Sequence, residues 1–186
     1  MHFEIRDHRI VGIPFLASPF ADARPEEAQP ELVVVHGISL PPGEFGGRYV
    51  EEFFLGQLNP DAHEYFAAIR GMEVSAHLFM RRDGEMIQFV PFDRRAWHAG
   101  RSAWCGRERC NDFSIGIELE GTDDCPYDPR QYEALAAVID ALRTAYPGLR
   151  DEAIVGHSDI APGRKTDPGP SFDWDHLRRC MANRCL

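Results

Sequence analysis

Lysine is almost absent from this sequence: of its 20 lysine and arginine residues, only Lys165 is a lysine. Long apolar runs are missing as well, because the longest uncharged stretches, such as Ile10–Ala21, are about twelve residues long, broken by proline and too short to span a bilayer. There is no basic block, and the formal net charge is −10. An acidic chain without a positive stripe binds nucleic acid and anionic membrane surfaces poorly, so we expect neither as a partner.

A secretion signal and a disulfide framework are also missing. Met1–His8 has neither the basic start nor the apolar core of a signal peptide. The cysteines are odd in number and form no C-x-x-C pair, which indicates free thiols in a reducing compartment. They are Cys105, Cys110, Cys125, Cys180 and Cys185. We therefore expect a cytoplasmic protein whose cysteines are small buried hydrophobic residues.

What is present fits a single globular domain over residues 1–186. The chain is 44% hydrophobic and 11% aromatic, enough for a full core, and no repeat or linker divides it. Four strand regions are predicted: Leu32–Ile38, a hairpin over 74–91 that turns at Asp83–Gly84, the alternating Ser114–Glu120, and Ala153–Val155. Helices are predicted from Asn59–Pro60 towards Ile69, from Asp128–Pro129 to Pro147, and over Ser171–Met181. This irregular alternation predicts an α/β fold with a central mixed β-sheet flanked by helices.

The single lysine lies in an irregular run, Gly156–Pro170, which also contains His157 and two aspartates among turn-forming proline and glycine. Because arginine serves elsewhere, a lysine kept here indicates a need for a compact ammonium with movable donors. The run is typical of a loop that carries a metal-binding or catalytic cluster. Arginine-biased coding that leaves one lysine at random is the alternative.

Three residues have the chemistry of zinc ligands: His36, His157 and Asp167. Catalytic zinc takes three protein ligands and leaves a fourth position for water, and two histidines with a carboxylate form one such set. Both histidines lie at the end of an apolar strand, which delivers side chains rigidly to one edge of a sheet. The spacing alone is not a recognised zinc signature, so a core-edge histidine and a turn or helix-capping aspartate remain alternatives.

A carboxylate also stands in the middle of the strand Ser114–Glu120. Alternation places Glu118 and Glu120 on the face opposite the strand's apolar residues. A carboxylate in such a strand is costly unless it is paired or used. The small Gly116 beside it favours a functional role for Glu118, whereas for Glu120 a solvated face is an equal alternative.

Four stretches carry a resemblance: Val33–Gly47, Arg94–Gly100, Gly106–Gly121 and Gly156–Pro170. Together they resemble the zinc-dependent N-acetylmuramoyl-L-alanine amidase family (amidase type 2). That family includes phage lysozyme-type amidases, peptidoglycan-recognition proteins and the cytosolic 1,6-anhydro-N-acetylmuramyl-L-alanine amidases of peptidoglycan recycling. The resemblance covers about residues 25–174, and motifs this long and ordered favour the zinc site over its alternatives.

The resemblance implies an enzyme that hydrolyses the amide between the lactyl group of 1,6-anhydro-N-acetylmuramic acid and L-alanine. It implies a zinc ion bound by His36, His157 and Asp167, with Glu118 and Lys165 as catalytic residues. The residues implied to lie near a small muropeptide substrate are Trp97, His98, Arg109 and Ala161. We expect a cytoplasmic monomer. Several arginines around these motifs are expected to attract the carboxylates of the peptide stem: Arg101, Arg107, Arg109 and Arg164.

Three positions depart from the family pattern. Gly37 stands where the anhydro-muramyl enzymes have asparagine, so any contact from that side chain is lost. Glu73 stands where they have arginine, which puts one charge contact to the substrate in doubt. Ala76 stands where phage and recognition-protein relatives place a catalytic tyrosine, which leaves that chemistry to Glu118. His77, which follows it, is expected to be a packed histidine without a direct role.

A non-catalytic muropeptide receptor on the same fold is the main alternative function. Such a receptor would be expected to lack a zinc ligand or Glu118, and this sequence has all of them. An exported amidase acting on intact peptidoglycan would share the chemistry, but it is expected to show a signal peptide or a wall-binding repeat, and neither is seen.

Overall fold

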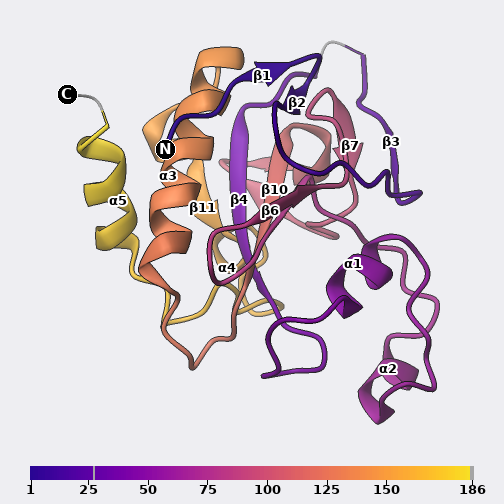
Figure 1. Cartoon of the computed structure of the whole chain (residues 1–186). Coiled ribbons are helices and arrows are strands. Elements are labelled where there is room, and N and C mark those ends of the chain that lie inside the picture. The colour runs from indigo at the N-terminus through magenta and orange to yellow at the C-terminus, as the bar shows by residue number, and fades with distance from the viewer. Residues whose placement is uncertain (27, 185–186) are drawn as a thin grey trace.

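Five strands form one mixed sheet in the computed structural model, which describes residues 1–26 and 28–184. Their order across the sheet is β11–β4–β10–β5–β6 (Figure 1). They are β11 (Ile154–Gly156), β4 (Leu32–Ile38), β10 (Ser114–Glu120), β5 (Leu78–Met80) and β6 (Met86–Gln88). The first four run parallel, whereas β6 pairs antiparallel with β5 in the hairpin. The predicted α/β fold with a central mixed sheet is confirmed.

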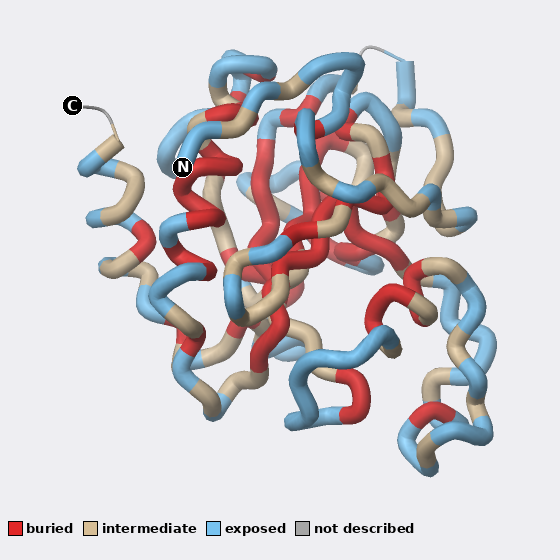
Figure 2. The backbone as a smooth tube through the Cα atoms, in the orientation of Figure 1, coloured by how far each residue is buried: buried red, intermediate tan, exposed pale blue. Residues whose placement is uncertain are grey.

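The central strands β4 and β10 are buried on both faces, and the sheet is the most deeply buried part of the tube in Figure 2. Val33 and Val35 of β4 join the core cluster that contains α3 (Pro129–Ala145). Leu32 and Val34 join a different cluster on the opposite face. Because side chains alternate along a strand, His36 points to that opposite face, away from α3.

Helix α3 begins where the sequence predicted. Asp128 caps it in a capping box with Gln131, and Pro129 is its first residue. Helix α5 (Trp174–Ala182) packs against α3 but begins later than the predicted Ser171. The reason is that the Asp173 carboxylate accepts the backbone N–H of His176, which starts the helix there.

Three short helices complete the fold: α1 (Tyr49–Phe54), α2 (Glu64–Ala68) and α4 (His157–Ile160). The prediction of a helix opening at Asn59–Pro60 was wrong, because the Asn59 side chain accepts the Asp61 N–H in a turn and His63 caps α2 instead. Helix α1 was not predicted from the sequence.

Small two-stranded sheets and 3-10 turns fasten the connecting loops. They are β1 (Ile5–Arg6) with β2 (Arg9–Ile10), β3 (Ala21–Ala23) with β7 (Arg94–Ala96), β8 (Ala103–Trp104) with β9 (Arg107–Glu108), and the turns Cys110–Asp112 and Asp151–Ala153. Arg24, directly after β3, donates to the carbonyls of Phe92, Asn111 and Ser114. Arg24 therefore holds three segments together that are distant in sequence, at a point next to the start of β10.

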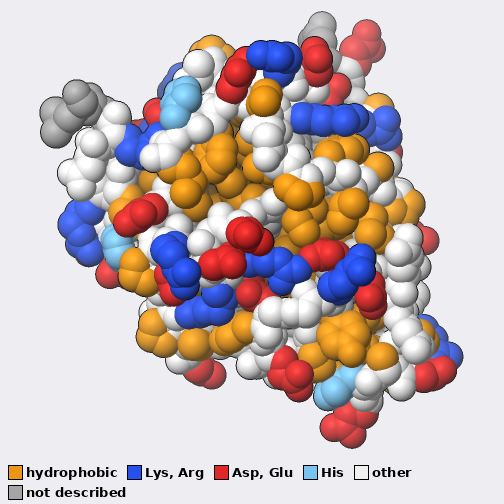
Figure 3. Space-filling model, in the orientation of Figure 1, with side chains coloured by type: hydrophobic (Ala, Val, Ile, Leu, Met, Phe, Trp, Pro, Cys, Tyr) orange, Lys and Arg blue, Asp and Glu red, His pale blue; other side chains and the backbone are white. Residues whose placement is uncertain are grey.

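The surface agrees with only part of the sequence analysis. Cys110 is buried as predicted, but Cys105 is exposed, and Cys185 lies outside the described residues. In the described part of the chain, no helix has the length and apolar character needed to cross a membrane. Figure 3 shows acidic and basic side chains interspersed on the face in view.

Candidate active site

The candidate site lies where the parallel strands end. His36 and Glu118 are register partners on β4 and β10, so their side chains project to the same face of the sheet. His157 is the first residue of α4, directly after β11. Asp167 comes from the loop that follows α4. The carboxyl ends of parallel strands form the edge at which open α/β sheets hold their ligands.

Two imidazoles and a carboxylate converge at this edge. His36 Nδ1 lies 3.0 Å from His157 Nδ1, and Asp167 Oδ2 lies 3.1 Å from each of these nitrogens. Both histidines are buried, with 1% and 2% of their surface exposed. Three potential ligand atoms at nearly equal separations are what an ion with three protein ligands requires. The structure thus brings together the three residues predicted from the sequence.

The positions of the protons on these two imidazoles leave room for a cation between His36 Nδ1, His157 Nδ1 and Asp167 Oδ2. His157 Nε2 lies 3.2 Å from the Ala99 carbonyl oxygen, so Nε2 carries the proton and Nδ1 presents a lone pair. His36 Nε2 lies 2.9 Å from His98 Nδ1, and a proton donated along this contact leaves a lone pair on His36 Nδ1 too. Two lone pairs and a carboxylate oxygen then face one another, and a metal ion would hold them together.

The charge states of His36 and Asp167 also suit metal binding. Burial lowers the pKa of His36 to about 4, against the opposing effect of Asp167, so this imidazole is neutral near pH 7. Burial alone would raise the pKa of Asp167, but its interactions with the adjacent His157 and His36 outweigh burial and hold that pKa well below its usual range. Neutral imidazoles and an ionised carboxylate are the forms that bind a divalent metal.

Glu118 lies beside the ligand triangle without belonging to it. Its Oε1 is 3.8 Å from His36 Nδ1, further than the 3.1 Å of Asp167 Oδ2. Among the residues that the structure describes, no protein group hydrogen-bonds to its buried Oε2. Burial, followed by the charge of Asp167, raises the pKa of Glu118 well above its usual value, while Lys165 opposes the shift. A carboxyl group with a raised pKa and a free oxygen is suited to proton transfer.

These groups face a cavity of about 530 Å³. Glu118, Lys165, His157 and Asp167 line it, and so does His98 from the predicted substrate residues. The apolar part of its wall is built by residues of α1 and of the segments around α1 and α2, among them Leu40, Phe53, Ile69 and Met72. The cavity therefore combines a polar end at the sheet with an apolar side, as is usual for small-molecule sites.

His98 contacts a predicted ligand as well as the cavity. Besides its contact with His36, its Nε2 lies 3.0 Å from Ser114 Oγ, so the three side chains form a buried chain behind the site. Its imidazole lies over Gly116, where any Cβ atom would overlap with the ring. The small residue noted beside Glu118 is thus explained by the room that His98 needs. His98 orients His36 from behind, as partners of metal-binding histidines commonly do.

Two other predicted substrate residues line a separate cavity of about 310 Å³. Arg109 and Ala161 lie there with Arg101 and Arg164, which brings three of the four expected arginines together. The carbonyl of Ala99 connects this cavity to the cluster of candidate ligands, because it faces His157 Nε2 and also accepts from Arg164 Nη2 at 2.6 Å.

The other two residues expected near the substrate, Arg107 and Trp97, lie outside these cavities. Arg107 does not line the arginine cavity: its guanidinium lies over the Phe113 ring and pairs with Glu31. Trp97 lines neither of the two cavities, and its ring lies 6.3 Å from that of Phe20.

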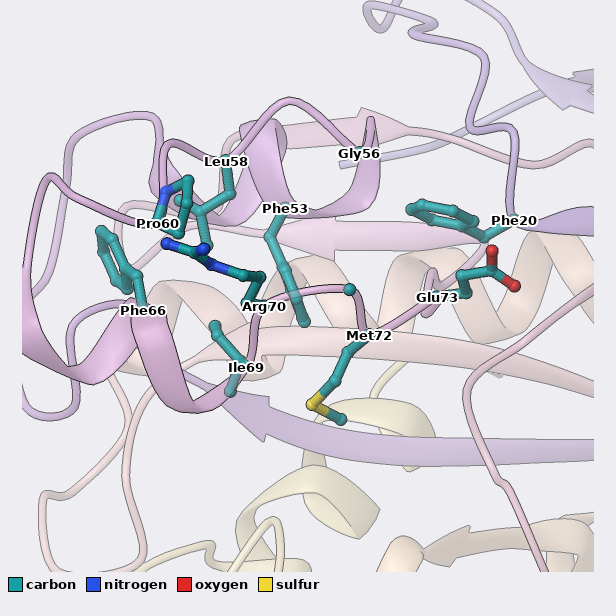
Figure 4. A pocket seen from close by; sticks show the side chains of 11 residues that line it. Phe20, Phe53, Gly56, Leu58, Pro60, Phe66, Ile69, Arg70, Met72 and Glu73 are labelled. Atoms are coloured by element: carbon teal, nitrogen blue, oxygen red, sulfur yellow. The ribbon is translucent and has the colours of Figure 1, made fainter.

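The departures from the family pattern fall at distinct places. Gly37 lies against the hydroxyl of Tyr127, which fills the space that a side chain there would need. Glu73 lines a third cavity, of about 200 Å³ (Figure 4). Phe53, Ile69 and Met72 line both this cavity and the site cavity.

Ala76 and His77 behave as core residues. Ala76 is fully buried in the cluster beside α1. His77 is also buried, where it accepts the Gly116 N–H and lies 3.0 Å from the Arg94 carbonyl, so it is the packed histidine expected from the sequence.

Sequence reasoning missed Tyr127 and Ser114, both next to the ligand set. Tyr127 lies outside the four stretches that carry the resemblance and directly precedes a helix cap. Ser114 lies within one of those stretches, but as the first residue of a strand it has no feature that indicates a function. The unusual Gly37 was the available signal for Tyr127, since a missing side chain leaves space for another residue.

Residues 26–170 match the family described as N-acetylmuramoyl-L-alanine amidase. The chain therefore belongs to the N-acetylmuramoyl-L-alanine amidase family and is an enzyme of that class.

Within this family the chain is similar to one kind of member in particular. It is 60% identical to the 1,6-anhydro-N-acetylmuramyl-L-alanine amidase AmpD of Citrobacter freundii, over 89% of this chain and 88% of that protein. Among solved structures, a crystal structure of an AmpD selenomethionine derivative superposes with a TM-score of 0.92 at 55% identity, covering 95% of this chain and 98% of that one. The amidase AmiD from Escherichia coli, in complex with the substrate anhydro-N-acetylmuramic acid-L-Ala-D-γ-Glu-L-Lys, reaches a TM-score of 0.59 at 28% identity, over 96% of this chain and 65% of AmiD.

Proposed function

We propose that this chain is a zinc-dependent amidase that cleaves the lactyl–L-alanine bond of 1,6-anhydro-N-acetylmuramyl peptides, as a cytoplasmic monomer of peptidoglycan recycling. The observation that carries the proposal is the ligand triangle of His36, His157 and Asp167 beside Glu118, with His157, Asp167 and Glu118 lining one cavity. The 60% identity to an amidase named for this substrate supports the bond that is cleaved. The peptide complex of AmiD supports the size of the ligand.

The proposed chemistry divides between the metal and the protein. His36, His157 and Asp167 would hold a zinc ion, which would supply a Lewis acid and would lower the pKa of a water molecule to about 7. Glu118 takes a proton from the attacking water and returns it to the departing nitrogen of L-alanine, which a carboxyl group with a raised pKa does at little cost. His98 holds the His36 imidazole in the orientation that directs Nδ1 to the triangle.

Lys165 is proposed to stabilise the oxyanion of the tetrahedral intermediate. Its side chain lines the cavity with Glu118, and no ion-pair partner for its ammonium occurs in residues 1–26 and 28–184. The neighbouring Arg164 is committed elsewhere, because it donates to the carbonyls of Ala99 and Arg101. A positive donor already in place near the oxyanion is worth roughly 3–4 kcal/mol of transition-state stabilisation.

The arginine cavity is proposed to take the carboxylates of the peptide stem. Arg101, Arg109 and Arg164 line it, and the Ala99 carbonyl links it to His157. Arginine binds carboxylates in a bidentate manner, which gives a local attraction for an anionic peptide in a chain of net charge −10.

Product analysis tests the proposal directly. The full chain is incubated with an anhydro-muramyl peptide and, in parallel, with a reduced muramyl peptide of the same stem, and the products are identified by mass spectrometry. Free peptide with an L-alanine N-terminus and intact anhydro-sugar is expected from the first substrate. Binding without cleavage would favour the receptor alternative.

Lys165→Arg is expected to lose activity although the charge is kept. The guanidinium is wider than an ammonium and its donors lie in a fixed plane, so it cannot take the same place in the cavity beside Glu118. We expect Lys165→Arg and Lys165→Ala to lower kcat by about 10²–10³-fold with zinc content unchanged. Arg6→Ala, which removes an exposed ion pair with Glu4, is the control and should leave kcat unchanged. Near-normal kcat in zinc-loaded Lys165→Arg would make Lys165 an ordinary loop residue.

The acid limb of the pH profile is expected to move in Lys165→Ala. The Lys165 charge lowers the pKa of Glu118, against the larger raising effects of burial and Asp167. Removing that charge raises the pKa further, so Glu118 stays protonated, and unable to accept a proton, up to a higher pH. The acid limb of kcat/KM should therefore shift to higher pH than in the unsubstituted chain. An unmoved limb would show that Lys165 does not act on Glu118.

A further inference from the structure

Tyr127 is a buried residue next to the site to which the proposed mechanism gives no part. It lies just before the cap of α3, with its ring edge-on to Phe172 at 5.3 Å between centroids. Its hydroxyl donates to the Pro168 carbonyl at 3.0 Å. Burial raises the pKa of Tyr127, so the hydroxyl keeps the proton that this bond needs.

The phenol occupies a slot left by two glycines. A Cβ atom added to Gly37 would come closer to Tyr127 Oη than the 3.0 Å that real Cβ contacts respect, and one added to Gly121 would overlap with the ring in the same way. Gly37 follows His36 on β4, so alternation turns it to the α3 side of the sheet. Tyr127 therefore packs against the β4 backbone from behind the site, next to a proposed ligand.

The contact continues to the other two ligands. Pro168 directly follows Asp167, and its Cδ would lie 2.9 Å from a Cβ atom at Gly156, the residue before His157. Tight contacts thus run from Gly37 through Tyr127 and Pro168 to Gly156. The three backbone positions in this series, Gly37, Pro168 and Gly156, are each adjacent in sequence to one proposed ligand.

We propose that Tyr127 is a positioning residue for the metal-binding cluster and that Gly37 is the residue that makes room for it. The hydrogen bond from Tyr127 to Pro168 and the packing of Tyr127 against β4 fix Asp167 relative to His36. The donor atoms are thereby held 3.0–3.1 Å apart. This inference rests on the proposed zinc site. It also gives the departure at Gly37 a physical meaning, because a side chain at that position would displace the phenol.

Tyr127→Phe in the full chain separates the hydroxyl from the packing of the ring. We expect its zinc dissociation constant, measured by competition with a chromophoric chelator, to rise about 10–100-fold. The visible spectrum of the Co²⁺-loaded protein is expected to change, because the ligand geometry is no longer fixed. Tyr132→Phe is the matched control: Tyr132 packs on the same Phe172, but its hydroxyl accepts the N–H of Asp173 at the cap of α5. Its zinc affinity and Co²⁺ spectrum should be unchanged.

Gly37→Ala tests the second half of the proposal. The new Cβ overlaps with Tyr127 Oη but would lie 3.5 Å from Cζ, an ordinary contact. Gly37→Ala alone is therefore expected to weaken zinc binding about 10–100-fold. Combined with Tyr127→Phe, it should add little to the loss that Tyr127→Phe causes alone, since the overlapping oxygen has gone.

Unchanged zinc affinity and an unchanged Co²⁺ spectrum in Tyr127→Phe would overturn the positioning role. A lower melting temperature with intact zinc affinity would do the same and leave Tyr127 a role in core stability alone. Additive losses in the double variant would overturn the coupling to Gly37. Failure of the unsubstituted chain to bind zinc is a separate result, because it would refute the proposed zinc site itself.

Discussion

Removing the metal is expected to abolish amidase activity, and adding zinc back is expected to restore it. Two imidazole nitrogens and a carboxylate oxygen face one another at 3.0–3.1 Å, an arrangement that a divalent cation stabilises. The purified chain should contain about one zinc ion, measured by elemental analysis before and after chelation. Activity is followed in the same samples by release of the L-alanine peptide. Full activity in rigorously metal-free protein would refute the proposed mechanism.

Substitution of a ligand should have the same effect as chelation. His36→Ala or Asp167→Ala removes one of only three protein ligands, so both metal and activity are expected to be lost. His2→Ala, which changes an exposed histidine at the N-terminus, serves as the control and should retain both. A His36→Ala protein that still held one zinc ion per chain would show that other residues bind the metal.

The long strands could be predicted because short sequence patterns indicate which of their residues are buried. β4 and β10 have the predicted bounds, since a β-branched run and a strict alternation are recognisable without knowledge of their neighbours. The alternation of apolar and other residues along β10 also predicted correctly that Glu118 lies on the face opposite the apolar residues of the strand. Its pairing with His36 could not be predicted, because the register of two parallel strands depends on contacts between segments far apart in sequence.

The short elements could not be predicted for the opposite reason. Helix α1 and the strands β3 and β7 have few residues, so tertiary contacts rather than local propensity stabilise them. Asn59–Pro60 has the pattern of a helix start, but the Asn59 side chain forms a turn with Asp61 instead.

In the site, residue types were predictable but their supporting contacts were not. Glu120 illustrates this: a solvated face was an equal alternative, yet the residue is buried and accepts the N–H groups of Gly46 and Arg82. The contact of His98 with His36 and the slot for Tyr127 at Gly37 likewise depend on packing between distant segments. A sequence pattern carries the chemistry of a residue but not the distance to a partner in another segment.

Replacing Glu118 by alanine or glutamine is expected to lower kcat by about 10²–10⁴-fold while the metal stays bound. Glu118 Oε1 lies 3.8 Å from His36 Nδ1, outside the triangle of donor atoms, so its removal leaves all three proposed ligands in place. Its role is to transfer protons in the transition state, so kcat and kcat/KM should fall together and KM should change little. Glu118→Gln keeps the size of the side chain and removes only the proton acceptor, which separates the chemistry from packing.

The comparison of zinc content with turnover decides the role of Glu118. Glu133→Ala, which removes an exposed carboxylate on α3, is the control for a general effect of charge and should retain both zinc and activity. If Glu118→Gln lost zinc in proportion to activity, Glu118 would have to be counted among the ligands. If it kept both zinc and turnover, proton transfer would have to come from another group in the cavity, and the raised pKa of Glu118 would reflect only its burial beside Asp167. Retained zinc with lost turnover is the result that assigns the proton transfer to Glu118.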